Sequence, residues 1–283
     1  MNNEKDLKTE RVIEILSETR RNDLLASSRT LFMITSSTIS AVLTNPLHRF
    51  FVRKQIGIRS KFGYDANIWR GAGLNSVILT SSILIQSSLV SAFRSAGILP
   101  EKSAFDHVMA FGLSGIVAET ILYPLVRLRN TVFANPNIDS FLDIKKIISR
   151  AFLEEGPQGA FKGLSLSLFM IFPFHSIFSA TQEQLKSIES PHLRSSLSLF
   201  SAALVLYPFD TALKTYQTDG YANSRIRIYS SWTKILLAIK TKGLGFAYRG
   251  LPSFIFYFLT NQLLHRMLFI ELYEQAYFIN DSY

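Results

Sequence analysis

Cysteine is absent from the 283 residues. Disulfides, thiolate metal sites and cysteine nucleophiles are therefore excluded. The five histidines are scattered, and the sequence contains no Gly-x-Ser-x-Gly elbow, Walker loop or His-Glu-x-x-His motif. No aromatic-basic RNA-binding motif or zinc spacing accompanies the net charge of +9. The sequence therefore predicts neither an enzyme, nor a metal protein, nor a nucleic-acid-binding protein.

The N-terminal segment also lacks the usual targeting signals. It has no apolar core of about 7–15 residues and no Arg-rich, acid-poor stretch, so import is expected to depend on internal signals. Residues 4–21 carry Leu7, Val12, Ile15 and Leu16 near helical spacing. This spacing predicts an amphipathic surface helix or a frayed tail.

Apolar residues are abundant. They make up 48% of the chain, which includes 23 Phe, and the mean hydropathy is +0.19. Six stretches come near the ~20 residues that cross a bilayer core: 30–46, 72–93, 107–126, 164–182, 195–213 and 250–272. Their Ser, Thr and Gly content suits helices that pack closely and turn one polar face to a cavity. The alternative is a soluble protein with six core helices.

Charge is distributed unevenly among the loops between these stretches. Residues 48–71, 124–163 and 208–250 hold six, six and seven Lys or Arg against one, four and two Asp or Glu. Basic loops stay on the side from which helices insert. The three loops are therefore expected on one side of the membrane and both termini on the other.

Two short patterns each occur three times. Prolines end apolar stretches at Asn45-Pro46-Leu47-His48, Tyr123-Pro124-Leu125-Val126 and Tyr207-Pro208-Phe209-Asp210. Aromatic-basic-glycine triplets follow at Trp69-Arg70-Gly71, Phe161-Lys162-Gly163 and Tyr248-Arg249-Gly250. The prolines lie 78 and 84 residues apart and the triplets 92 and 87. The chain is therefore predicted to contain three diverged copies of a unit of about ninety residues.

This alternation resembles the mitochondrial carrier family, the solute transporters of the mitochondrial inner membrane, over roughly residues 25–278. The resemblance implies an all-α membrane protein with six transmembrane helices in three pseudo-repeats. The expected segments are a polar N-terminal part (1–24), repeat 1 (25–98), repeat 2 (99–188), and repeat 3 with a short C-terminal tail (189–283). Pro46, Pro124 and Pro208 would kink the odd-numbered helices and close a three-fold basket. The alternative for each proline is that it merely ends a helix.

The family pattern after each proline is Pro-x-acid-x-x-base-x-base-x-Gln, and its acids and bases pair between repeats as a matrix gate. The residues assigned to this gate by resemblance are His48, Arg53, Gln55, Arg129, Asp210 and Gln217. By the family pairing, His48 would face Arg129, Val126 would face Leu213, and Asp210 would face Phe51. No standard ion pair between repeats is therefore expected. Arg49 or Lys214, on an adjacent helical turn, could take the place of a missing basic residue of the gate.

A second, cytoplasmic gate of the family lies near the far ends of the even-numbered helices. The candidates here are Arg94, Glu183, Lys186 and Glu271, with Glu274 as an alternative to Glu271. One pair between Arg94 and Glu271 is expected. An exposed pair contributes only ~0–1 kcal/mol, so this gate is predicted to be weak.

The triplets are candidate lipid sites, because the N–H groups at a helix N-terminus attract phosphate. The residues concerned are Arg70, Gly71, Lys162, Gly163, Arg249 and Gly250. The resemblance implies cardiolipin as the bound lipid, held together with short matrix helices predicted at 139–153 and 230–241. The segment 56–68 is too short for a third such helix.

The resemblance places the substrate about two turns beyond each triplet glycine, at Ile78, at Met170 with Ile171, and at Tyr257. None of these residues is charged, although nucleotide carriers usually have basic residues there. The ionisable residues expected at cavity depth are Glu119 and His175. An intramembrane charge indicates function by default. The two are expected to face each other and to take up a proton with the substrate or to bind its cationic group. For His175 the alternative is a structural hydrogen bond.

The predicted function is solute transport by alternating access, with a small anionic metabolite or a nucleotide as substrate. A monomer surrounded by membrane lipid is expected, without a cofactor other than the lipid. Because both gate patterns lack several of their charged residues, one alternative stays open. It is a carrier-fold receptor, adaptor or insertion factor that does not transport. The lack of cysteine and the incomplete gate patterns also suit a carrier that an intracellular pathogen sends to host mitochondria.

Overall fold

The computed structural model describes residues 31–58, 69–98, 103–135, 145, 148–149, 153–219 and 231–280, with only the backbone described for 104, 232, 236 and 270–280. Within these ranges every regular element is a helix. The elements are the helix Leu31–Leu43, α2 (Asn45–Gln55), α3 (Ala72–Ser95), α4 (Ala104–Ala134), η1 (Pro157–Phe161), α6 (Leu164–Gln184), α7 (Pro191–Thr218), α8 (Trp232–Lys242), α9 (Leu244–Ala247) and α10 (Leu251–Asn280). The predicted all-α class is confirmed.

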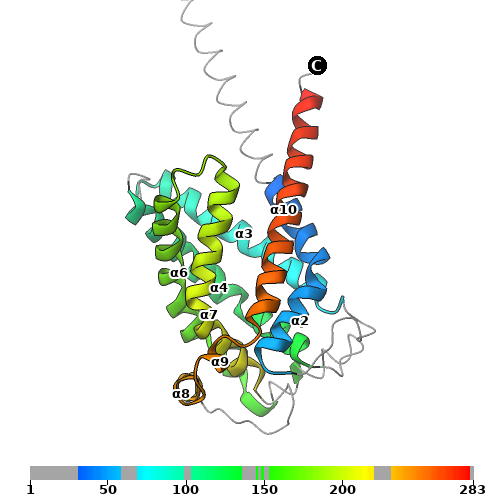
Figure 1. Ribbon diagram of the computed structural model, residues 1–283, viewed down its shortest axis with the longest axis vertical. Helices are drawn as coiled ribbons and strands as arrows, with labels where there is room; N and C mark the ends of the chain where they lie inside the picture. Colours follow the sequence, from blue (N-terminus) through cyan, green and yellow to red (C-terminus); the bar gives the residue numbers. More distant parts are fainter. Residues whose placement is uncertain are drawn as a thin grey trace, which may run out of the picture.

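The long helices form one bundle in which chain neighbours pack together (Figure 1). α3 packs on α4, α4 on α6 and α6 on α7, and α10 returns to pack against α2. Hydrogen bonds also join the helix Leu31–Leu43 to α10, for instance from Ser40 Oγ to Asn261 Oδ1 at 2.8 Å. The short helices α8 and α9 lie at one end of the bundle, and α10 runs to the other. Thr38 Oγ1 of the helix Leu31–Leu43 lies 2.7 Å from Thr80 Oγ1 of α3, and α10 also contacts α7, so the helices form a ring.

Four helical segments are long and apolar enough to cross a membrane: Ala72–Ser95, Phe105–Ala134, Pro157–Gln184 and Pro191–Thr218. Their outer faces carry large exposed apolar side chains, among them Val77, Ile121, Phe169 and Val205. Such faces are unfavourable in water and favourable against lipid. Each of the six predicted stretches falls mainly on a helix within the described residues, although the helix Leu31–Leu43 and α10 are not among these four spans.

The prolines do not end the helices. Pro124 lies inside α4 and Pro208 inside α7, and each helix continues ten residues further, to Ala134 and Thr218. The expected ends at 126 and 213 were therefore wrong. Only Pro46 stands next to an interruption, at Thr44, with α2 following directly. A proline inside a membrane helix is tolerated where neighbouring helices satisfy the backbone groups that it frees.

The predicted matrix helix at 230–241 is confirmed as α8. Most of the predicted helix 139–153 lies outside the described residues, although positions 145, 148, 149 and 153 are helical. The short link of repeat 1 also lies mostly outside them. Its described part, 56–58, contains no helix.

Candidate functional site

The two repeated patterns contact each other inside every repeat. The residue before each proline donates a side-chain hydrogen bond to the backbone carbonyl of the basic residue in the triplet. The three bonds are Asn45 Nδ2 to Arg70 O (3.1 Å), Tyr123 OH to Lys162 O (2.9 Å) and Tyr207 OH to Arg249 O (2.8 Å). All three donor residues are buried. These bonds join the odd-numbered helix of each repeat to the start of its even-numbered helix.

The triplet glycines then join one repeat to the next. All three have positive φ, 77° at Gly71, 91° at Gly163 and 80° at Gly250, which favours glycine. A Cβ atom would lie 2.8 Å from Phe133 at Gly71, 2.9 Å from Leu213 at Gly163, and 2.8 Å from the backbone nitrogen of Gln55 at Gly250. Each glycine thus abuts the odd-numbered helix of the following repeat, with the third repeat returning to the first.

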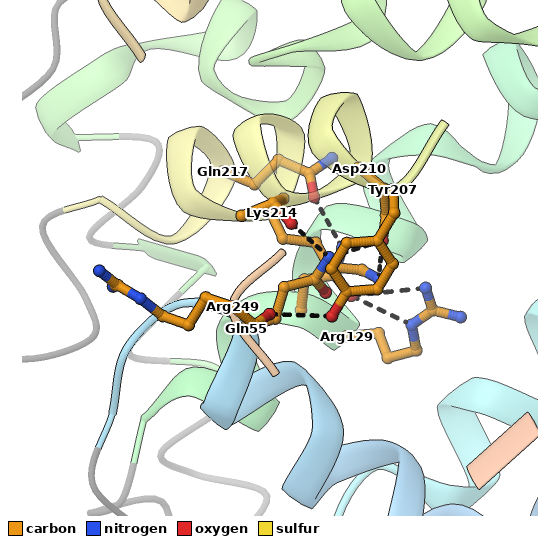
Figure 2. A network of polar contacts seen from close by, with 9 residues as sticks. Gln55, Arg129, Tyr207, Asp210, Lys214, Gln217 and Arg249 are labelled. Carbon is orange, nitrogen blue, oxygen red and sulfur yellow. Dashed lines mark hydrogen bonds and ion pairs between the residues drawn. The ribbon is translucent and has the colours of Figure 1, made fainter. Parts of the chain in front are cut away.

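A buried polar layer lies near the triplets, at the end of the bundle where α8 and α9 lie (Figure 2). Gln55 of α2 donates through Nε2 to Asp210 Oδ2 of α7 at 2.9 Å, and Lys214 Nζ lies 2.6 Å from the same oxygen. The Lys214 ammonium also lies 4.4 Å from the centre of the Phe51 ring. Lys214 therefore contacts both Asp210 and Phe51. It is one of the residues expected to take the place of a missing basic residue of the gate. The ion pair remains within α7 and does not join two repeats.

A second polar chain links α4 to α7. Asn130 Nδ2 donates to Gln217 Oε1 at 2.6 Å, and Gln217 Nε2 donates to the Tyr123 hydroxyl at 2.8 Å. Because that hydroxyl donates in turn to the Lys162 carbonyl, the chain continues to the start of α6. Gln55 and Gln217, assigned to the gate from sequence, both make hydrogen bonds between repeats.

The predicted partners of the gate do not all meet. Arg129 donates to Asn75 Oδ1 at 2.9 Å and is 3.4 Å from Asn130 Oδ1, whereas His48 stacks on Tyr257 with ring centres 4.7 Å apart. No hydrogen bond joins His48 to Arg129 among the described contacts. The two residues still lie close enough to interact electrostatically, so they share the polar layer without a direct hydrogen bond. Arg53 is buried on α2.

Aromatic side chains from all three repeats pack beside the polar layer. The buried cluster contains Phe51, Val52, Phe133, Tyr207, Phe254 and Phe258. Phe51 and Tyr257 also stack, with ring centres 5.9 Å apart. Apolar and aromatic contacts between the repeats therefore close this end of the bundle.

A cavity of about 410 Å³ lies inside the ring of helices. Its described lining comes from α3, α4, α6, α7 and α10: Gln86, Gly115, Glu119, Ser167, Met170, Ile171, Phe174, His175, Ala203, Leu206, Tyr207, Asp210 and Phe254. Four of the six residues proposed from sequence for substrate line it, namely Glu119, Met170, Ile171 and His175. Ile78 is buried outside the lining, and Tyr257 packs on His48.

Glu119 and His175 share the cavity without pairing. Glu119 Oε1 accepts a hydrogen bond from Ser167 Oγ at 2.5 Å. His175 lies two helical turns beyond Ser167 on α6, about 12 Å along its axis, and its ring contacts Phe111 and Phe174. The described contacts include no ion pair between Glu119 and His175, and the partnership expected across the cavity stays a prediction. Asp210 is a second acid in this cavity.

The predicted cytoplasmic gate stays largely a prediction. Glu183 and Lys186 pair with each other at the end of α6 and are mostly exposed, so they do not join two helices. Arg94 lies in the last turn of α3. Glu271 and Glu274 lie on α10 where only the backbone is described.

A buried ionic cluster lies beside the second triplet. Glu155 pairs with Arg127 and lies 3.8 Å from Lys162 Nζ, and all three side chains are at most 11% exposed. Lys162 also lies over the Tyr216 ring, 4.7 Å from its centre. In repeat 3, the Arg249 guanidinium lies over the Phe246 ring at 4.7 Å. The lipid contacts proposed for both triplets remain predictions.

Sequence reasoning missed several residues of the site. Ser167 and Gln86 looked like ordinary polar residues of membrane helices, and Asn130 fell outside the gate pattern. The position of the tyrosines was a usable signal, because Tyr123 and Tyr207 stand directly before prolines 84 residues apart. That regularity indicates a shared role, although it does not identify the carbonyl that each hydroxyl binds.

Comparison with known proteins adds an independent observation. The family model "Mitochondrial carrier protein" matches residues 100–193. The chain is similar to a mitochondrial thiamine pyrophosphate carrier 1 of Botryotinia fuckeliana, at 30% identity over 170 residues, which cover 54% of the chain and 52% of that relative. This match therefore spans about half of the relative's length.

Two further relatives match over longer stretches. Mitochondrial substrate carrier family protein A of Dictyostelium discoideum is 22% identical over 251 residues, covering 77% of the chain and 76% of the relative. A probable ADP,ATP carrier protein of Arabidopsis thaliana is 26% identical over 215 residues, covering 67% and 64%. The matches extend well beyond the segment that the family model covers.

Proposed function

Because the chain belongs to the mitochondrial carrier family, we propose that it is a solute transporter that works by alternating access around its central cavity. The family and the apolar helices make it a multi-pass protein of a mitochondrial membrane. The proposal specifies the inner membrane, with the basic loops in the matrix and the termini on the opposite side.

The observation that carries the proposal is the cavity itself. Five helices contribute to its lining, and a carboxylate, an imidazole, an amide and a hydroxyl are present among apolar side chains. Sites of this kind, near the middle of a membrane and between structural repeats, are typical of transporters. A protein that used only its outer surface would have no need for an acidic group inside it.

The substrate expected from sequence was a small anion or a nucleotide. Relatives named for thiamine pyrophosphate and for ADP and ATP support a phosphate-bearing solute. The described lining of the cavity gives that expectation little support, because it includes neither Lys nor Arg. We therefore propose that the protein transports a small organic solute whose charge complements the residues that line the cavity.

The proposal includes a lipid environment. Cardiolipin bound at the triplets is suggested by the positive-φ glycines at the starts of α3, α6 and α10 and by the basic residue beside each. A monomer is proposed, since one chain supplies a complete ring of helices.

The alternative function is a receptor, adaptor or insertion factor that does not transport. It is favoured by the aromatic closure and by the described gate contacts, which include no ion pair between repeats. Purified protein in cardiolipin-containing liposomes, screened with nucleotides, carboxylates, phosphate, amino acids and amines, separates the two. Saturable uptake of any solute supports transport. Failure of every class to move, with protein that is correctly inserted and folded, favours the alternative.

A further inference from the structure

The charge of the cavity is unusual for a site meant to bind an anion. Its described ionisable side chains are Glu119, Asp210, His175 and the phenol of Tyr207. Two of these are acids, and the same lining includes no Lys or Arg. A bound anion would have to approach carboxylates in a space with little water to screen them.

The two acids differ in their partners. Asp210 is compensated at the floor of the cavity, with Lys214 Nζ at 2.6 Å and the Gln55 amide at 2.9 Å. Glu119 accepts a hydrogen bond from the neutral hydroxyl of Ser167 at 2.5 Å. Arg129 acts on this carboxylate electrostatically from the polar layer, but the described contacts give Glu119 no direct ion pair with a cation. Ser167 stabilises and orients the carboxylate without neutralising it.

A carboxylate without a direct ion-pair partner inside a membrane protein is costly. We propose that the cavity binds a solute with a positively charged group that pairs with Glu119, so that the solute supplies the missing charge. The proposal rests on the proposed transport function for its physiological meaning, although binding can be measured without transport.

The walls of the cavity suit the rest of such a solute. Phe174, Tyr207 and Phe254 contribute aromatic faces or edges from three different helices, and Met170 adds a polarizable side chain. Aromatic faces attract cations as well as apolar groups. The favoured ligand class is therefore an organic amine or other organic cation with an apolar or aromatic body.

The competing interpretation is an anion held by the cations below the cavity. Arg129 is partly exposed and Lys214 is buried, and both lie outside the described lining. Lys214 is paired with Asp210, and Arg129 donates to Asn75. An anion would therefore have to break existing contacts, whereas a cation meets Glu119 directly.

Three probes of similar size and different charge test the proposal on the full-length protein in detergent. They are phenethylamine, 2-phenylethanol and 3-phenylpropionate, titrated by the thermal shift of intrinsic tryptophan fluorescence. The amine is expected to bind at least about tenfold more tightly than the other two. Tighter binding of the acid, or equal binding of all three, would overturn the proposal.

Variants then assign the effect to one residue. Glu119→Gln should remove most of the amine preference, Glu119→Asp should retain part of it, and Glu183→Gln, at an exposed acid, should leave it unchanged. A Glu119→Gln protein that melts normally and still prefers the amine contradicts the assignment. If that variant does not fold, the comparison of the three probes on the wild-type protein still decides the charge of the ligand.

Uptake into liposomes separates this inference from the transport proposal. Selective amine binding without uptake of any solute would support the cation site and contradict transport. Uptake of anions alone, with no amine bound or moved, would support transport and contradict the cation site.

Discussion

The Tyr207 hydroxyl donates to the Arg249 carbonyl at 2.8 Å, joining the residue before the third proline to the basic residue of the third triplet. Tyr123 and Asn45 make the corresponding bonds in the other two repeats. Two patterns about 25–42 residues apart in the sequence are therefore one structural unit, repeated three times.

Removing one of these bonds should destabilise the bundle. Tyr207→Phe leaves the Arg249 carbonyl without its buried donor, at an expected cost of about 1–3 kcal/mol. Melting followed by intrinsic fluorescence, which needs no cysteine dye, measures the effect. Tyr248→Phe is the matched control, since its ring stacks on Tyr207 and no described hydrogen bond involves its hydroxyl. Equal melting temperatures for the two variants would contradict the role of the bond.

Glycine substitutions separate backbone strain from steric contact. Gly97 and Gly250 both have positive φ, 67° and 80°, but a Cβ atom at Gly97 meets nothing within 4 Å, whereas one at Gly250 lies 2.8 Å from the Gln55 backbone. Gly97→Ala should therefore cost about 1–2 kcal/mol from φ alone. Gly250→Ala should melt at a clearly lower temperature. The same melting temperature for both would mean that the contact between repeats 3 and 1 is looser than described.

The buried Glu155 should matter far more than an exposed acid. Glu155→Gln leaves Arg127 and Lys162 without their buried carboxylate, and breaking such a pair costs about 3–5 kcal/mol. Glu183→Gln removes a pair whose side chains are more than 60% exposed, worth about 0–1 kcal/mol. Melting temperatures of both variants check the contrast. A minor effect of Glu155→Gln would indicate that water reaches the cluster.

Transport is expected to depend on Glu119 more than on His175. Glu119→Gln should abolish or uncouple uptake of a confirmed substrate while folding and insertion remain normal, because it removes the acid that lines the cavity without a direct ion pair among the described contacts. His175→Ala, two turns further along α6, should weaken uptake less. Initial rates in liposomes at several pH values test this order. Wild-type rate and pH dependence in Glu119→Gln would exclude such a role.

The natural absence of cysteine allows the cavity charge to be probed directly. Cationic and anionic methanethiosulfonate reagents are compared by the ratio of their reaction rates. This ratio of cationic to anionic rate should be higher at Gln86→Cys, in the cavity, than at the exposed Ser95→Cys. A factor of about ten or more is expected inside a weakly screened cavity. Adding Glu119→Gln should bring the ratio toward the surface value. A higher relative rate for the anionic reagent would place the dominant field at Arg129.

The sequence by itself determined the helical class, the membrane setting and the three repeats. These features depend on local composition and on spacing along the chain, so they are readable without knowing any contact. The short helix α8 and the even-numbered helices starting at Gly71, Gly163 and Gly250 follow from the same kind of signal.

The tertiary structure alone decided which side chains meet. Helices α4 and α7 continue past their prolines because packing and polar contacts with neighbouring helices stabilise the extra turns, which include Asn130 and Gln217. Glu119 meets Ser167 instead of His175 because the rotation and relative height of α4 and α6 set the contact. Both quantities arise from packing between helices, and the spacing of residues within one helix does not encode them.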